Sequence, residues 1–106
     1  MYTDFAGVYD RLMADVDYDA WAMHYRDLLS RCGVTDGAAV LEPACGTGNL
    51  SVRLARHYRL QPSDASVEML SIAAKKARDA GLLLPFVHQD MRRLRAHPPA
   101  DAVICA

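Results

Sequence analysis

VLEPACGTGN, residues 40–49, joins a short apolar run to a loop that contains two glycines. The run starts at Ala38 and is typical of a strand that is buried on both faces, as the strands of parallel sheets are. Gly46 and Gly48 allow the loop backbone to pass close to a ligand and to point its N–H groups at the ligand's polar end. Glu42 closes the strand, where its carboxylate can accept hydrogen bonds from a ligand's ammonium group. The pattern therefore predicts a strand, a ligand-binding loop and a helix in succession.

Strands and helices alternate along the rest of the chain. Short apolar runs predict strands at 38–41, 58–61, 86–89 and 102–105. Helical periodicity predicts helices at 4–13, 21–32, 50–54 and 66–81. We expect Pro62 to end the second strand, because proline cannot donate to a ladder, and Ser66 to cap the last helix. Strands that alternate with helices imply an α/β fold with a parallel sheet and right-handed crossovers.

Composition and charge exclude several classes of protein. Hydrophobic residues make up 52% and charged residues 24% of the 106 residues, as in globular domains. No apolar run reaches the roughly 18 residues of a membrane span, and the opening residues do not resemble a signal peptide. The net charge of −1 argues against nucleic-acid binding. We expect a cytoplasmic protein that binds neither membranes nor nucleic acid.

Cysteine and histidine positions argue against a metal site. The three cysteines, Cys32, Cys45 and Cys105, contain no Cys-x-x-Cys pair, which disfavours a zinc site and a disulfide framework. The four histidines share no ligand spacing. Cys45 lies in the glycine loop without an identifiable activating base, so we interpret it as a small loop residue that makes backbone contact.

Acidic residues follow two more of the predicted strands. Asp64 lies 16 residues after Gly48, where a carboxylate can take the two hydroxyls of a ribose. Asp90 follows the third strand and can accept a hydrogen bond from an adenine amino group, while Met91 can lie against the purine ring. Taken singly, these are ordinary turn, loop and core residues. Together they place polar groups at three strand ends, where ligands of open α/β sheets bind.

Two other interpretations of the glycine loop stay open at this point. A dinucleotide fingerprint that starts at Gly46 needs its third glycine at position 51, which is Ser51. A nicotinamide-binding fragment is therefore disfavoured. The loop alone is also compatible with an ordinary turn between a strand and a helix.

The motifs resemble those of the class I S-adenosylmethionine-dependent methyltransferases, over nearly the whole chain. Glu42–Asn49 resembles the acidic-x-(Gly/Ala)-x-Gly-x-Gly first motif, and Asp64–Leu70 is similar to the Asp-x-Ser-x-x-Met-Leu second segment. Gln89–Met91 resembles the adenine-side motif, and Asp101–Cys105 the opening of the fourth strand. Phe5–Met13 is similar to the N-terminal helices of bacterial small-molecule-type members.

The resemblance implies a Rossmann-like sheet of about four strands in the order 3-2-1-4, preceded by two helices. Since the family sheet has seven strands, it also implies an N-terminal half: a single incomplete domain over 1–106, with a helical lid over 1–34 and a core over 38–106. We expect the fourth strand to leave an open edge through which the chain self-associates.

The resemblance further implies S-adenosylmethionine as cofactor, S-adenosylhomocysteine as product and a small-molecule methyl acceptor. It names no catalytic residue, and a non-catalytic cofactor-binding or interaction module is the alternative. Tyr9 is expected to cover the cofactor, or else to be a packing aromatic. The implied cofactor-binding residues are Tyr9, Glu42, Ala44, Cys45, Gly46, Gly48, Asp64, Ala65, Met69, Asp90 and Met91.

Overall fold

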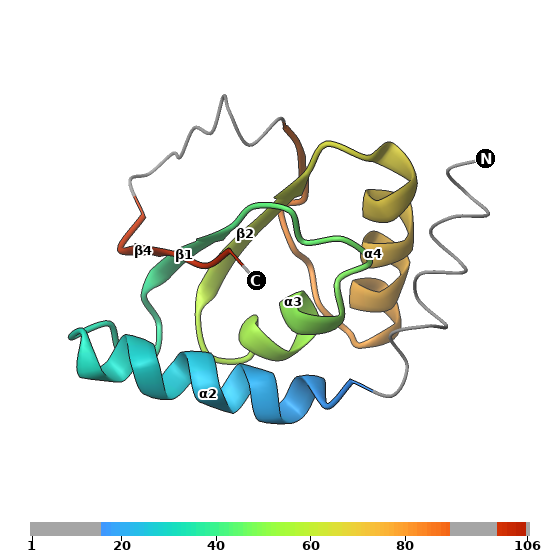
Figure 1. Ribbon diagram of the computed structural model, residues 1–106. Helices are drawn as coiled ribbons and strands as arrows, with labels where there is room; N and C mark the ends of the chain where they lie inside the picture. Colours follow the sequence, from blue (N-terminus) through green and yellow to red (C-terminus); the bar gives the residue numbers. More distant parts are fainter. Residues whose placement is uncertain (1–15, 90–99, 106) are drawn as a thin grey trace.

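The computed structural model describes residues 16–89 and 100–105, which form three helices and four strands (Figure 1). In chain order these are α2 (Tyr18–Arg31), β1 (Ala39–Glu42), α3 (Asn49–Leu54), β2 (Arg59–Asp64), α4 (Val67–Asp79), β3 (Val87–His88) and β4 (Ala102–Val103). The helix predicted over 4–13 lies outside the described residues, as do the predicted site residues Tyr9, Asp90 and Met91.

The strands form one parallel sheet in the order β3-β2-β1-β4. β1 pairs with β2 along its whole length, from Ala39 opposite Arg59 to Glu42 opposite Pro62. On its other side β1 pairs with β4. The predicted Rossmann-like α/β sheet and its strand order are confirmed. Because the strands are parallel, the carboxyl ends of β1 and β2 open at the same edge of the sheet.

One hydrophobic core joins the sheet to the helices. Its buried side chains are Ala22, Val40, Leu50, Leu54, Tyr58, Leu60 and Ile104. Figure 1 shows α2 lying along α3. α3 contributes Leu50 and Leu54 to the core. Ala22 is the buried residue of α2, while Tyr18, Tyr25 and Leu29 are partly buried against the core. Much of α2 is therefore held by contacts close to the surface.

Pro62 does not end the second strand, contrary to our prediction. β2 continues through Pro62 to Asp64, and Pro62 lies opposite Glu42 in the ladder. The N–H groups of a strand alternate in direction, and that of Arg59 donates to Ala38 on the β1 side. The N–H that Pro62 lacks therefore faces β3, where pairing begins only at Ser63. The proline thus costs the ladder no hydrogen bond.

The third and fourth strands are shorter than predicted. β3 is limited to Val87–His88, since the N–H of Phe86 donates to the Leu84 carbonyl oxygen (2.9 Å) instead of to the ladder. β4 is limited to Ala102–Val103, although the N–H of Ile104 still donates to Leu41 (2.8 Å). Among the described strands, none lies on the far side of β4. Self-association through that edge stays a prediction.

The predicted cap of the last helix is confirmed, whereas the helix predicted over 21–32 begins earlier than expected. The Ser66 hydroxyl accepts from the Met69 N–H (3.2 Å) and caps α4, and Gly81 follows that helix at φ +74°. α2 starts three residues before Trp21, because Asp17 accepts from the Ala20 N–H (3.0 Å). In the described part of the chain, no helix is both long and apolar enough to cross a membrane.

Candidate functional site

The glycine loop connects β1 to α3 and is fixed to the end of β2. The N–H of Cys45 donates to the Ser63 carbonyl oxygen (2.9 Å), and the N–H of Gly46 donates to Asp64 Oδ2 (2.9 Å). The loop turns through left-handed backbone at Ala44 (φ +56°), Gly46 (φ +60°) and Gly48 (φ +83°). Ala44 is the one non-glycine residue with positive φ in the described ranges. The end of β2 therefore sets the shape of the loop.

The two glycines of the loop serve different purposes. A Cβ added at Gly48 would lie 2.8 Å from the Cβ of Ala73 and 3.0 Å from its Cα, so Gly48 lets α3 approach α4 closely. A Cβ added at Gly46 would meet no atom within 4 Å. The Gly46 backbone thus borders open space, as a ligand-facing glycine does. Gly48 packs against Ala73 of the neighbouring helix, and its predicted contact with the cofactor stays a prediction.

A cavity of about 350 Å³ lies between the glycine loop and α2. The loop side and its flanks contribute Glu42, Ala44, Cys45, Gly46, Thr47, Asn49 and Leu50, and the opposite side contributes Val16, Tyr18, Trp21 and Tyr25. Four of the predicted cofactor-binding residues, Glu42, Ala44, Cys45 and Gly46, are thereby brought together. Among the described residues, Gly48, Asp64, Ala65 and Met69 do not line this cavity.

Sequence reasoning missed the aromatic wall of the cavity. Trp21 and Tyr25 belong to the apolar stripe whose periodicity predicted the helix over 21–32, and such a stripe normally indicates a core-facing surface. In the structure Trp21 is 49% exposed and packs its ring 6.0 Å from that of Tyr25. The incomplete burial of a large aromatic side chain beside a cavity is the feature that assigns this wall to the site.

Glu42 is a buried acid at the loop side of the cavity. Its side chain is only 2% exposed, and its Oε1 accepts a hydrogen bond from the Ser51 hydroxyl (2.5 Å). Burial disfavours the charged form and raises the pKa of Glu42 to about 7, although the Ser51 hydrogen bond acts in the opposite direction. A cationic group in the cavity would favour the carboxylate form.

Asp64 fastens the loop to the start of α4. Its Oδ2 accepts from the Gly46 N–H, and its Oδ1 accepts from the Ser66 N–H (2.8 Å). A carboxylate has about four acceptor positions, so two of them serve the fold and others can serve a ligand. The sequence offered both a ligand role and an ordinary turn role for Asp64, and the bond to Ser66 is such a turn contact. The bond to Gly46 was not predicted.

Cys45 is buried and unsuited to nucleophilic chemistry. Burial, together with the nearby carboxylates of Glu42 and Asp64, raises the pKa of the Cys45 thiol to about 12. The thiol donates weakly to the carbonyl oxygen of Gly46 (3.7 Å). Since the thiolate is the reactive form, Cys45 acts as a small packing residue in the loop.

Residues 40–106 match the family model described as a methyltransferase domain. The chain belongs to this family. It is 36% identical over 103 residues to a protein of Geobacillus sp. (strain WCH70) named as a methyltransferase, covering 96% of this chain and 42% of that protein. It is 35% identical to the trans-aconitate 2-methyltransferase of Rhodococcus jostii (strain RHA1), covering 82% of this chain and 35% of the relative.

A solved structure supports the same assignment for this methyltransferase-domain chain. The S-adenosylmethionine-dependent methyltransferase from Clostridium acetobutylicum ATCC 824 superposes with a TM-score of 0.81 at 35% identity, covering 98% of this chain and 43% of the other. The fold is that of the class I methyltransferases, whose methyl donor is S-adenosylmethionine. The chain spans about two fifths or less of the length of the curated relatives named here.

Proposed function

We propose that the chain binds S-adenosylmethionine between the glycine loop and α2, and that it takes part in methyl transfer to a small-molecule acceptor. The observation that carries this proposal is the cavity in which open backbone at Gly46 and the carboxyl group of Glu42 face an aromatic wall. A small-molecule acceptor is supported by the relative from Rhodococcus jostii, which is named for trans-aconitate.

The polar groups and the open loop backbone of the site fit this cofactor. Glu42 would hold the ammonium group of the methionine part by a charged hydrogen bond. Gly46 would allow the cofactor to lie against the loop backbone, since no side chain occupies that space. Asp64 would bind the ribose hydroxyls at the end of β2, with Ala65 and Met69 beside it. Tyr9, Asp90 and Met91 are further proposed contacts.

Positioning is the main task that we assign to the chain. S-adenosylmethionine supplies an activated methyl group and a neutral leaving group, so holding the reactants in line supplies much of the catalysis. In this view the loop and β2 fix the cofactor, and residues 1–34 act as a lid that α2 represents in the described structure. The aromatic side chains of α2 would then exclude water from the reacting groups.

Cofactor binding is tested directly with the cavity's own chromophore. Trp21 is the single tryptophan of the chain and lines the cavity, so its fluorescence should change when S-adenosylhomocysteine binds. At 100 times the dissociation constant, the ligand should add about 2.7 kcal/mol of apparent stability by mass action. NAD serves as the matched control and should cause neither effect. Stabilisation by NAD but not by S-adenosylhomocysteine would refute the proposal.

Asp64→Ala should weaken S-adenosylhomocysteine binding by about 1.5–3 kcal/mol, the value of charged hydrogen bonds. It should also lower the free energy of unfolding, because the Gly46 and Ser66 N–H groups lose their acceptor. Asp64→Asn keeps one acceptor oxygen, so its affinity and its free energy of unfolding should lie between those of Asp64→Ala and the wild type. Calorimetry and urea denaturation measure the two effects, with Asp79→Ala as an exposed control on α4. Unchanged affinity in folded Asp64→Ala protein would exclude Asp64 from the site.

A further inference from the structure

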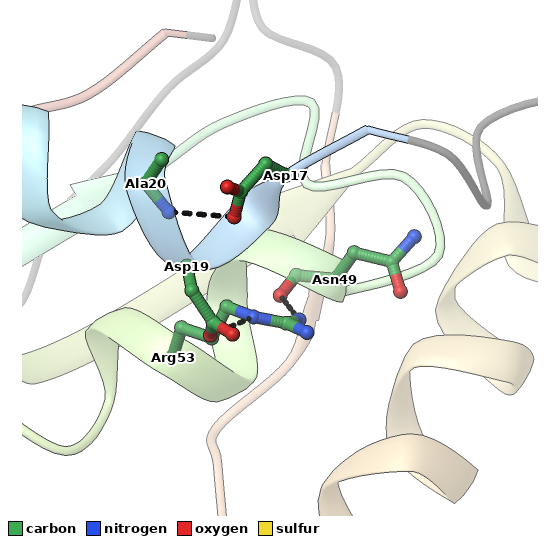
Figure 2. A network of polar contacts seen from close by, with 5 residues as sticks. All are labelled: Asp17, Asp19, Ala20, Asn49 and Arg53. Atoms are coloured by element: carbon green, nitrogen blue, oxygen red, sulfur yellow. Dashed lines mark hydrogen bonds and ion pairs between the residues drawn. The ribbon is translucent and has the colours of Figure 1, made fainter.

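Arg53 connects the start of α2 to the start of α3, as Figure 2 shows. Its Nε donates to Asp19 Oδ1 (2.7 Å), and its Nη1 donates to the carbonyl oxygen of Asn49 (2.6 Å). The same guanidinium group lies over the ring of Tyr18, 5.6 Å from the centroid. One planar group thus binds a carboxylate, a carbonyl oxygen and an aromatic face at once, which suits arginine and not lysine.

The Asn49 end of this arrangement continues into the glycine loop. Asn49 is the first residue of α3. Its Oδ1 accepts from Lys76 Nζ of α4 (2.8 Å), and its Nδ2 donates to the hydroxyl of Thr47 (3.4 Å). Lys76 Nζ also donates to that hydroxyl (3.3 Å). The carbonyl group held by Arg53 therefore belongs to a residue that fixes the last part of the loop.

Arg53 touches both walls of the cavity without lining it. Tyr18 belongs to the α2 wall and Asn49 to the loop wall, whereas Arg53 and Asp19 are not among the lining residues. As an exposed ion pair the Asp19–Arg53 contact would count for little, since Asp19 is 83% exposed. Arg53, however, makes three contacts at once. Because Ala22 is the one buried residue of the described helix α2, these contacts contribute substantially to holding α2 against α3.

We propose that Arg53 is a positioning residue that sets the separation of the α2 wall and the glycine loop, and so controls the affinity of the cavity for the cofactor. This inference rests on the proposed function. It assigns to Arg53 an effect on binding that is transmitted through Tyr18 and Asn49. It also predicts that α2 shifts when Arg53 is shortened, whether or not a ligand is present.

The test compares Arg53→Ala and Arg53→Lys with Arg31→Ala, which removes an exposed ion pair from the far end of α2. Acrylamide quenching of Trp21 in the ligand-free protein should increase in Arg53→Ala and stay at the wild-type value in Arg31→Ala. Affinity for S-adenosylhomocysteine should fall about tenfold in Arg53→Ala, within the range over which neighbouring groups couple. Arg53→Lys should keep the fold and show intermediate values of quenching and affinity. It therefore tests the proposal even if Arg53→Ala does not fold.

The contribution of α2 is isolated by Asp19→Asn, alone and combined with Arg53→Ala. If Asp19 acts through Arg53, the double variant should bind no more weakly than Arg53→Ala. The inference is overturned if Arg53→Ala changes quenching and affinity no more than Arg31→Ala does while the wild type binds. Absence of binding in the wild type would instead refute the proposed function, and the quenching comparison would still report on the position of α2.

Discussion

Gly48→Ala is expected to destabilise the protein by about 2–5 kcal/mol, from left-handed strain and from overpacking together. The added Cβ would lie 2.8 Å from that of Ala73, and the backbone at φ +83° already disfavours any side chain. Gly81→Ala is the matched control. It has a similar φ of +74° but meets nothing within 4 Å, so only the strain of about 1–2 kcal/mol applies. Urea denaturation of both variants measures the difference.

A second-site change separates the two causes. Ala73→Gly removes the atom that the new Cβ would strike, so it should restore part of the stability of Gly48→Ala, although glycine within a helix costs about 0.5–1 kcal/mol by itself. The two substitutions should therefore couple. If Gly48→Ala lowered the free energy of unfolding no more than Gly81→Ala does, the inference that α3 lies close against α4 at Gly48 would be wrong.

The order of elements could be predicted from the sequence because it depends on local patterns. The apolar run before the glycine loop and the Ser66 cap each act within a few residues. The cap is found where it was expected, and the strand lies within one residue of its predicted bounds. Pro62 misled the prediction because its effect depends on which neighbour its missing N–H faces. That neighbour is chosen by the topology of the sheet and not by the residues around the proline.

In the candidate site, too, the features that depend on local sequence could be predicted, and those that depend on the tertiary fold could not. Glu42 and Gly46 were predicted as ligand-facing residues from their place in the loop, and both line the cavity. The hydrogen bond from Gly46 to Asp64 joins residues 18 apart and could not be read from either motif. Trp21 was hidden in an amphipathic stripe, since periodicity does not distinguish a core-facing wall from a cavity-facing one.

The pH dependence of Glu42 is the second large effect that we expect. The carboxyl group has a pKa of about 7 in the folded protein, above the ordinary value of 4.5. Between these two values the folded state keeps a proton that the unfolded state has released, so stability falls as pH rises through this window. The stability conferred by the protonated form is fully present below pH 4.5 and lost above pH 7. The loss amounts to about 3 kcal/mol, as 1.36 kcal/mol applies to each pKa unit.

Glu42→Gln should remove this dependence, because the carboxamide cannot ionise and still offers an oxygen to the Ser51 hydroxyl. The variant should equal the wild type near pH 4.5 and exceed its free energy of unfolding by up to about 3 kcal/mol at pH 8. Urea denaturation across this pH range measures the effect. Glu68→Gln, which alters a partly exposed glutamate in the first turn of α4, is the control.

Ligand binding gives the same carboxyl group the opposite preference. An ammonium group beside Glu42 favours the carboxylate, so the wild type should bind S-adenosylhomocysteine more tightly as pH rises through 7. Glu42→Gln should bind weakly and show no such rise. The buried acid would then lower stability at neutral pH while it strengthens cofactor binding, as residues of functional sites often do. If the free energy of unfolding depended on pH equally in wild type and Glu42→Gln, a buried Glu42 carboxyl group with a raised pKa would be ruled out. A variant that was stabilised but bound the ligand normally would place the ammonium group elsewhere.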